Sequence, residues 1–263
     1  MDRAGLLGQR SVVVAPGQRT WARLVRRGRG LDVGALAALG PWLVLAPHPD
    51  DEALGAGGML ARLAAAGADP RVAILTDGAA SHVGAPGWGP RRLAGVRRQE
   101  AGHAVRALGM RPALHLGWRD AAPPMVGDKV FRAGVRRLGA LIVRHRIRAL
   151  AVCWAGEAHC DHEAAAALAR AVVTAARGRV RLYEYLVWGW TDPALGAKLS
   201  GRRVVSVDVT GVRRAHRRSI DCHRSQTGTR VQGAVDPFRL PRAMIALTAR
   251  PRTVLLEGVR HAA

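Results

Sequence analysis

Short apolar runs alternate with segments of helical periodicity from Pro41 onward. The expected strands are residues 42–47, 71–76, 113–117, 149–154 and 181–189. The expected helices that follow the first four strands are residues 54–67, 91–109, 130–146 and 161–177. Strict alternation of this kind favours parallel strands whose crossover helices cover both faces of the sheet. The sequence therefore predicts an α/β fold of the Rossmann-like, doubly wound kind, with a mainly parallel sheet and helices on both faces.

The two ends of the chain depart from this alternation. Residues 1–35 are rich in Arg and Gly without a clear period, and they are predicted to form a basic N-terminal extension with one short helix near residues 19–27. The last part of the chain is expected to add two strands and a helix between them: residues 202–210, 252–258 and 211–224. With 263 residues that are 49% hydrophobic, the chain can bury one large core. We therefore expect residues 36–263 to form a single domain.

The formal net charge is +22, yet of the 41 Lys and Arg residues only Lys129 and Lys198 are lysines. A strong positive charge is typical of nucleic-acid-binding proteins. Here the arginines are spread along the chain, and aromatic residues that could stack on bases make up only 4%. The composition disfavours nucleic acid as a partner. It favours a solvated basic surface, with a phosphate-bearing substrate or peripheral contact with an anionic membrane as alternatives.

The sequence also bears on the cellular compartment. No apolar run reaches the roughly 18–20 residues of a membrane-spanning helix, and we identify no signal peptide at the N-terminus. The three cysteines, Cys153, Cys160 and Cys222, are scattered and odd in number, which argues against a disulfide framework. A cytoplasmic location is the expectation.

A histidine and three consecutive acids, in the sequence HPDDE, follow the first expected strand. His48 and Asp51 lie three residues apart on a strand-to-helix turn that Pro49 stiffens, so both side chains can point into one pocket. Imidazole nitrogen and carboxylate oxygen are ligands that suit Zn²⁺. Acids favour the start of a helix in any case, but this explains one or two acids, not three behind a histidine. The motif therefore predicts part of a metal site.

A second polar cluster, HCDH, begins just past the fourth expected strand. His159 and His162 are three residues apart at a helix start, so one can bind a metal while the other reaches a substrate. Asp161 could orient an imidazole through its ring N–H. Two surface histidines would be the ordinary interpretation. However, ligands in open α/β sheets bind beyond the carboxyl ends of the strands, where the first motif also lies. We expect the two clusters to meet.

Two histidines and one carboxylate leave a fourth metal position open for water, as in catalytic zinc sites. Asp50 is then free to act as general base on the metal-bound water. His159 can donate to the oxyanion of a tetrahedral intermediate or protonate the leaving nitrogen. Together, these groups are those needed for metal-assisted hydrolysis of an amide or an ester.

Together these motifs resemble those of the LmbE-like (PIG-L) zinc-dependent de-N-acetylases. APHPDDE is similar to the first motif of the family, and HCDH is similar to its second, with Cys where many members have Pro. The resemblance implies removal of an N-acetyl group from an N-acetylglucosamine-type glycoconjugate. It implies Zn²⁺ as cofactor, with Fe²⁺ or Co²⁺ as alternatives because the same ligands accept them.

The resemblance also implies a role for each motif residue. The implied metal ligands are His48, Asp51 and His162. Asp50 corresponds to the general base, and His159 to the group that stabilises the oxyanion or acts as acid, with Asp161 behind it. Weaker matches at VRRQE (96–100) and WRDAAPPM (118–125) make Arg97 and Asp120 candidates for substrate contact, and CHRSQ (222–226) resembles a late family segment.

Two alternatives to sugar deacetylation are kept. One is a basic protein that binds a polyanion or a membrane and has a structural metal site, and the other is an amidase or esterase acting on a non-sugar acyl group.

A phosphate-loop interpretation of GAGG (55–58) is disfavoured because the trailing Lys of a P-loop is missing, so close helix–sheet packing is predicted there. The WGW segment (188–190) could stack on a sugar or close the core.

Overall fold

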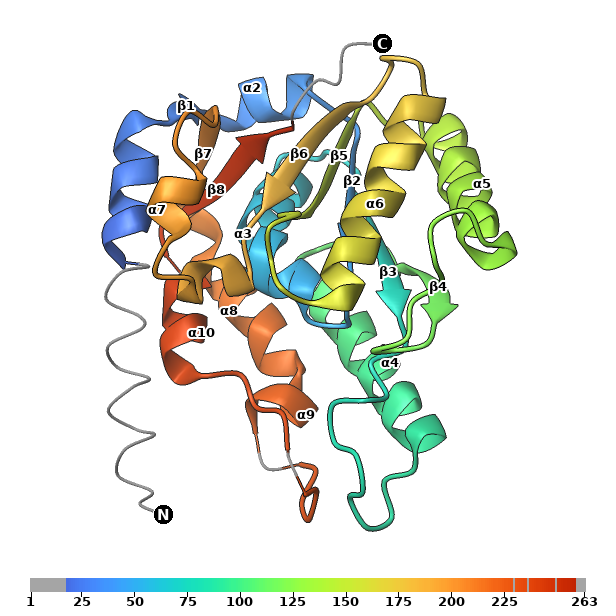
Figure 1. Cartoon of the computed structure of the whole chain (residues 1–263). Helices are drawn as coiled ribbons and strands as arrows, with labels where there is room; N and C mark the ends of the chain where they lie inside the picture. The colour runs from blue at the N-terminus through green and yellow to red at the C-terminus, as the bar shows by residue number, and fades with distance from the viewer. Residues whose placement is uncertain (1–17, 229, 236, 249, 259–263) are drawn as a thin grey trace.

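The structure, a computed structural model, describes residues 18–228, 230–235, 237–248 and 250–258. An eight-stranded sheet crosses the molecule in the order β1–β7–β8–β6–β5–β2–β3–β4 (Figure 1). The strands are β1 Arg29–Leu31, β2 Trp42–Ala46, β3 Arg71–Thr76, β4 Leu114–Trp118, β5 Ala149–Cys153, β6 Arg181–Tyr185, β7 Val204–Asp208 and β8 Arg252–Glu257. Every neighbouring pair is parallel except the two pairs that include β8, which is antiparallel to β6 and to β7. The predicted mainly parallel α/β fold is confirmed.

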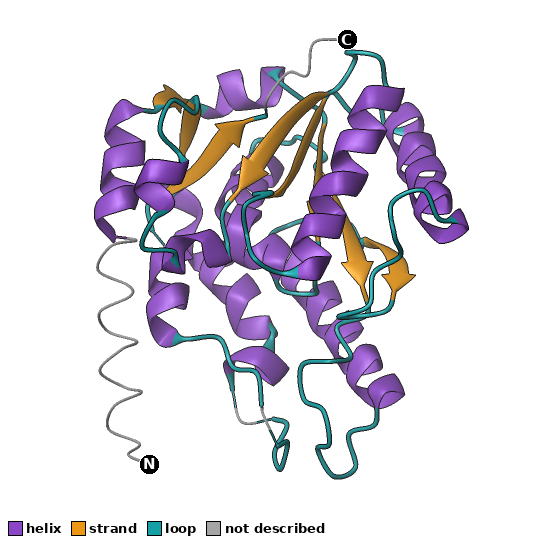
Figure 2. Cartoon of the chain, in the orientation of Figure 1, coloured by secondary structure: helices purple, strands orange, loops and turns teal. Residues whose placement is uncertain are grey.

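Helices cover both faces of this sheet (Figures 1 and 2). Helices α5 and α6 pack on one another, whereas α3 packs against α8 and α10, and α8 packs also against α4. The main helices are α2 Val33–Ala38, α3 Asp51–Ala65, α4 Pro90–Ala107, α5 Lys129–Arg144, α6 Cys160–Ala175, α8 Arg213–Cys222 and α10 Arg242–Thr248, and the short ones are α7 Leu195–Lys198, α9 Arg224–Thr227, η1 Trp188–Thr191 and η2 Thr210–Val212. Among the described residues, none of the helices has the length and apolarity needed to cross a membrane.

The centre of the sheet brings the two polar motifs together. Strands β2 and β5 are buried along their whole length and pair in parallel, with Leu43 opposite Leu150 and Leu45 opposite Val152. Their apolar side chains face helices on both sides, as expected for inner strands of a parallel sheet. Because the strands run in the same direction, the loops that follow them leave the sheet at the same edge. HPDDE and HCDH therefore lie side by side.

Three local features differ from the sequence prediction. Helix α3 begins at Asp51 rather than at residue 54, so two acids of HPDDE lie in its first turn, where the positive end of the helix dipole stabilises them. Strand β6 ends at Tyr185, and residues 188–191 form the 3₁₀ helix η1 instead of prolonging the strand. The antiparallel strand β8 lies between β6 and β7, a position that no local pattern indicates.

The described part of the predicted basic extension is folded. Residues 18–27 are helical, and Leu24 is 2% exposed in a core cluster with Trp190 and Leu199. Strand β1 extends the sheet beside β7, and its Leu31 is buried. Residues 1–17 of the extension lie outside the described residues. The division into an extension and a domain at residue 35 stays a prediction.

The glycines of GAGG lie where helix α3 approaches its neighbours closely. A Cβ at Gly57 would lie 2.7 Å from the His216 ring, and one at Gly58 would lie 2.9 Å from the Thr253 hydroxyl. A Cβ at Gly55 would overlap the ring of Tyr185. The predicted packing role of this segment is confirmed.

We expect Gly55→Ala to destabilise the protein. Tyr185 is fully buried, and its hydroxyl donates a hydrogen bond of 2.9 Å to the Leu45 carbonyl, so the ring cannot move without breaking that bond. Overpacking of this kind costs about 1–3 kcal/mol, which urea unfolding would measure. Gly95→Ala is the matched control, because Gly95 lies in helix α4 with nothing near its Cβ position. That control should gain about 0.5–1 kcal/mol, and equal effects would contradict the packing argument.

Candidate metal and active site

Three side chains from the two motifs face one another beyond the carboxyl ends of β2 and β5. The Nδ1 atom of His48 lies 3.1 Å from Oδ2 of Asp51, and Nε2 of His162 lies 3.5 Å from the same oxygen. Their ligand atoms all lie within 4.8 Å of one another. With metal–ligand bonds of about 2.0–2.1 Å, two ligands of one tetrahedral Zn²⁺ are separated by roughly 3.3 Å. The three atoms are therefore spaced as the ligands of a single ion.

One observation supports a metal at this position independently of that spacing. The Nε2 atom of His162 is fully buried and has no hydrogen-bond partner among the described residues. A buried polar nitrogen without a partner is costly, and here it is directed toward Asp51. The donor set of two imidazoles and one carboxylate is one that zinc accepts. The residues present thus fit a divalent metal ion.

The other ring nitrogen of His162 is held by Glu157. Its Nδ1 lies 2.7 Å from Oε2 of Glu157, and both side chains are completely buried. The second oxygen of Glu157 accepts hydrogen bonds from the backbone N–H groups of Val187 and Gly189, at 2.6 and 2.8 Å. A carboxylate that accepts the far N–H of a metal-binding imidazole fixes its tautomer and orientation. This contact leaves Nε2 of His162 free to bind a metal.

His48 is oriented in the same way by two other carboxylates. Its Nε2 lies 3.0 Å from Oδ2 of Asp161 and 3.3 Å from Oδ1 of Asp120. Asp161 also accepts the backbone N–H of Ala121 at 2.9 Å, and Asp120 accepts that of Ala80 at 2.7 Å. With Nε2 donating to these oxygens, Nδ1 of His48 is the nitrogen available to a metal. Residues that follow three different strands, β2, β4 and β5, therefore contact one imidazole.

The acids around these histidines make a positive charge in the site favourable. Burial would lower the pKa of His48, but hydrogen bonds to Asp120, Asp161 and Asp51 outweigh it and raise the pKa well above its ordinary value. Burial would raise the pKa of Asp51, but His162 and His48 outweigh it and lower the pKa to about 2. A bound cation would satisfy the same need for positive charge.

Asp50 precedes the ligand Asp51 in the chain, and its carboxylate pairs with Arg97. Its backbone has φ 153° and ψ −27°, a conformation that L residues rarely adopt, and its N–H donates to Glu52 Oε2 at 3.0 Å. One carboxylate oxygen lies 3.3 Å from Nη2 of Arg97. Burial raises the pKa of Asp50 to about 6, against the opposing charge of Arg97. The site thus contains a buried carboxylate that is not needed as a ligand.

Arg97 and Asp120, the predicted substrate contacts, are both engaged within the protein. Arg97 is 3% exposed, and it donates to the carbonyls of Gly78 and Pro49 at 2.8 and 3.0 Å. This network fixes Arg97 behind Asp50. Asp120 contacts the ring of His48, as described above. Contact of either residue with substrate stays a prediction.

His159 is the most exposed side chain of the group, at 39%. Its Nδ1 accepts the backbone N–H of Asp161 at 3.2 Å, which caps helix α6, whereas the Asp161 carboxylate is 3.9 Å away. The aspartate predicted to stand behind His159 therefore lies nearer to His48, and its backbone, rather than its carboxylate, contacts His159. Because Nδ1 accepts, the proton of the neutral ring lies on Nε2.

Sequence reasoning missed several residues that support the site. Glu157 was not singled out, although an acid two residues before HCDH was a signal that could have drawn attention to it. Glu52 contacts Nε2 of His223 at 3.0 Å, and Glu100 accepts the N–H and the hydroxyl of Ser225. These pairs explain why VRRQE and CHRSQ occur together, because Glu100 of one segment binds the other. No local pattern predicts contacts across more than a hundred residues.

Comparison with known proteins places this site in a family. Residues 43–173 match the PIG-L family, described as GlcNAc-PI de-N-acetylase. A 1D-myo-inositol 2-acetamido-2-deoxy-alpha-D-glucopyranoside deacetylase from Mycobacteroides abscessus is 32% identical over 175 residues, which cover 59% of this chain and 61% of that protein. The chain thus spans less than two thirds of the length of this curated relative.

Solved structures share the fold. N,N'-diacetylchitobiose deacetylase from Pyrococcus horikoshii has a TM-score of 0.59 at 20% identity, covering 76% of this chain and 75% of its own. A 4-carboxy-2-hydroxymuconate hydratase from Pseudomonas putida has a TM-score of 0.56 at 21% identity, covering 68% and 77%. At such identities the likeness concerns the fold alone. Since the two named reactions differ, the reaction must be argued from the site.

The matched segment contains HPDDE, HCDH and the two central strands that bring them together. Through these residues, 43–173, the chain belongs to the PIG-L family.

Proposed function

We propose that the protein is a metal-dependent hydrolase that removes the N-acetyl group from an N-acetylglucosamine-type sugar conjugate. The observation that carries the proposal is the buried Asp50 carboxylate, which lies beside the three ligand residues but is held by Arg97 instead of joining them. A purely structural metal site would need no such carboxylate. The PIG-L membership and the deacetylase relative support the same reaction class.

A divalent ion, Zn²⁺ or alternatively Fe²⁺ or Co²⁺, held by His48, Asp51 and His162, would supply Lewis acidity that lowers the pKa of water and polarises a carbonyl. Asp50 accepts the proton of the attacking water, while Arg97 keeps its carboxylate in place. The water oxygen bonds to the acetamide carbon, the C–N bond breaks, and acetate and a free amine are formed. The proton taken from water leaves with the amine nitrogen.

His159 is the candidate for the donor on the substrate side. Its ring is partly exposed, and its Nε2–H is free to point outward because Nδ1 accepts the Asp161 N–H. A donor of this kind stabilises the oxyanion of the tetrahedral intermediate or gives its proton to the leaving nitrogen. Arg97 contacts the carboxylate of Asp50, and Asp120 contacts the ring of His48. We propose that these two residues also contact the substrate.

We also propose a cytoplasmic location. The cysteines Cys153, Cys160 and Cys222 are all free thiols, as is typical of proteins in a reducing compartment. A phosphate-bearing glycoconjugate would suit the basic surface of the chain.

Asp50→Asn should lower acetate release from N-acetylglucosamine conjugates by about 10²–10⁴-fold, since an amide cannot accept the proton of water. The assay measures acetate and free amine over a panel of N-acylated sugars and non-sugar amides and esters, and elemental analysis confirms that the variant keeps its metal. Asp128→Asn, which changes an exposed aspartate, is the control. If the metal-loaded wild type releases no acetate from any of the sugars, the deacetylase proposal is wrong.

Removal of the metal by a chelator should abolish the activity, and addition of Zn²⁺ should restore it. The apo protein should also melt at a lower temperature, because a ligand that binds only the folded state stabilises it. Differential scanning fluorimetry with and without metal measures this second effect. Activity that survives complete removal of metal would contradict the mechanism.

Glu157→Gln should weaken zinc binding by roughly 10–100-fold, the usual effect of losing the carboxylate behind a metal-binding imidazole. Competition with a chromophoric chelator measures the affinity directly, without reference to turnover. Glu163→Gln is the matched control, because Glu163 is next to His162 in the first turn of α6 but is exposed. Equal affinities of the two variants would show that Glu157 does not position His162.

A further inference from the structure

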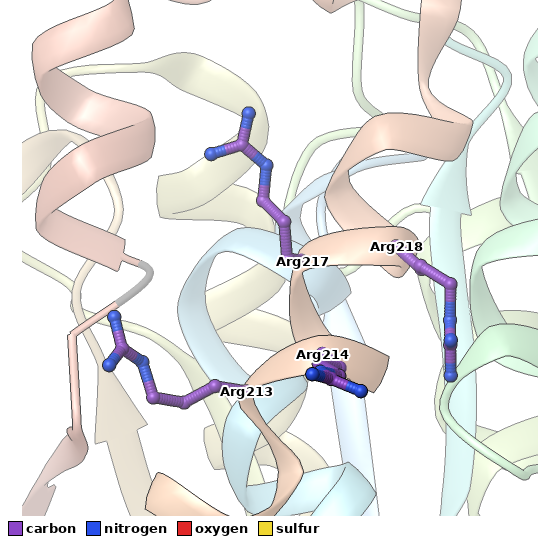
Figure 3. A pocket seen from close by; sticks show the side chains of 4 residues that line it. All are labelled: Arg213, Arg214, Arg217 and Arg218. Atoms are coloured by element: carbon purple, nitrogen blue, oxygen red, sulfur yellow. The ribbon is translucent and has the colours of Figure 1, made fainter.

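Helix α8 presents a row of arginines to solvent. Four exposed side chains line a surface hollow of about 520 Å³ on this helix (Figure 3), and we call them the α8 arginine face: Arg213, Arg214, Arg217 and Arg218. The opposite side of the helix is buried against the domain: His216, Ser219 and Ile220. The helix is thus fixed to the protein by one side and exposes these four arginines on the other, with Asp221 as the one exposed acid among its described residues.

This arrangement is electrostatically unfavourable for the protein on its own. Arg213 and Arg214 occupy the first turn of α8, where the positive end of the helix dipole disfavours cations, and no acid lies in that turn. Arg213 and Arg217, like Arg214 and Arg218, are four residues apart and repel each other. Only Arg217 has an ion pair, with Asp221 at 3.0 Å, and the other three have none among the described residues.

Neighbouring elements do not neutralise this charge. Arg62, in the last turn of α3, lies beside the start of α8, with its Nη1 3.7 Å from the Cβ position of Gly211. Asp208, at the end of β7, accepts the N–H of Thr210 at 2.8 Å and lies 3.9 Å from Arg252. A local arrangement that breaks the usual rules without compensation inside the fold indicates a functional surface.

The shape of the face favours a flat anionic partner. Helix α8 packs against both α3 and α4 and lies along the side of the domain rather than projecting from it (Figure 1). Because its inner side is packed against these two helices, α8 can meet a partner only with its outer, arginine-bearing side. None of the residues that line the hollow is aromatic, as base stacking would require. Lipid headgroups, by contrast, present phosphates in a plane, and guanidinium groups bind phosphate in a bidentate manner.

We propose that the α8 arginine face docks the protein on the surface of an anionic lipid bilayer. The phosphates of the headgroups would neutralise the first turn of α8 and relieve the repulsion between its arginines. This goes beyond the proposed function, since the face contains none of the residues assigned to metal binding or proton transfer. It would hold the protein at the surface where a lipid-linked substrate would lie.

The experiment compares the full-length wild type with a variant in which Arg213, Arg214, Arg217 and Arg218 are all replaced by Gln. Co-sedimentation is measured with vesicles of phosphatidylcholine alone and with vesicles containing about 30% phosphatidylglycerol. Each arginine near such a surface contributes about fivefold to binding, so the variant, which lacks four of them, should bind the anionic vesicles roughly several hundredfold more weakly. Wild-type binding should fall steeply with added salt.

A matched control removes the same charge elsewhere. It replaces four exposed arginines on or beside helices α5 and α6 by Gln: Arg136, Arg144, Arg148 and Arg177. This control should lose no more than a few-fold of the binding. Equal losses in the two variants would mean that only net charge matters, and unchanged binding of the α8 variant would also overturn the proposal. If the α8 variant keeps vesicle binding but loses binding to duplex DNA, the face is a nucleic-acid surface instead.

Two further measurements separate docking from folding and from catalysis. Because repulsion is removed, urea unfolding of the α8 Gln variant should occur at the same or a higher concentration than for the wild type. Replacement of the four arginines by Lys keeps the charge and should keep most of the vesicle binding, and its loss would contradict an electrostatic docking face. Hydrolysis of a water-soluble substrate should be unchanged in the Gln variant, so failure of the docking proposal and failure of the deacetylase proposal are distinguishable.

Discussion

The parallel pairing of β2 with β5 is the constraint on which the site depends. The two strands are distant in sequence but adjacent at the centre of the sheet, and both are buried along their length. In an open α/β sheet this is the place where the strand order changes direction and where ligands bind. HPDDE begins soon after β2, and HCDH begins helix α6 after the short loop that follows β5. Their relative position is therefore set by the pairing of the two buried strands.

Around this point the protein buries an unusual number of charged groups, and nearly all of them are paired. His162 is bound by Glu157, His48 by Asp161 and Asp120, Asp50 by Arg97. Burying a charge is tolerated only when partners replace the lost water. Among the described residues, the buried atoms of this network that have no hydrogen-bond partner include Nε2 of His162, Oδ1 of Asp161 and Nε of Arg97. Of these atoms, Nε2 of His162 lies 3.5 Å from Oδ2 of Asp51, where a metal would be bound.

The same electrostatic argument distinguishes the two ends of helix α8. The residue after the helix is His223, whose ring contacts the buried Glu52. Glu52 in turn accepts the backbone N–H of Asp50. The first turn of the helix carries Arg213 and Arg214, which have no ion pair among the described residues, whereas Arg217 in the next turn pairs with Asp221. Charges inside the site are satisfied within the chain, whereas those on the outer face are not. The start of α8 therefore fits the proposed contact with an external partner, whereas its end supports the site through His223 and Glu52.

Part of the site could be predicted because its residues lie close together in sequence. His48 and Asp51, or His159 and His162, are three residues apart after a strand, and this spacing is visible without a structure. The supporting residues could not be predicted in this way. Arg97 reaches Asp50 from helix α4, and Glu100 reaches Ser225 across 125 residues. A side chain's partners depend on which helices pack over the same edge of the sheet, and local periodicity does not encode that choice.

The sequence by itself determined the alternation of strands and helices, and with it the α/β class, because the period of apolar residues is a local property of the backbone. It also determined which residue types are available for a metal and for proton transfer. Only the tertiary structure decided that β8 enters the sheet antiparallel between β6 and β7. It alone decided that Asp161 turns its carboxylate toward His48, and that Glu157 binds His162. These outcomes follow from long-range packing and from the need of each buried charge for a partner, which no short stretch of sequence can specify.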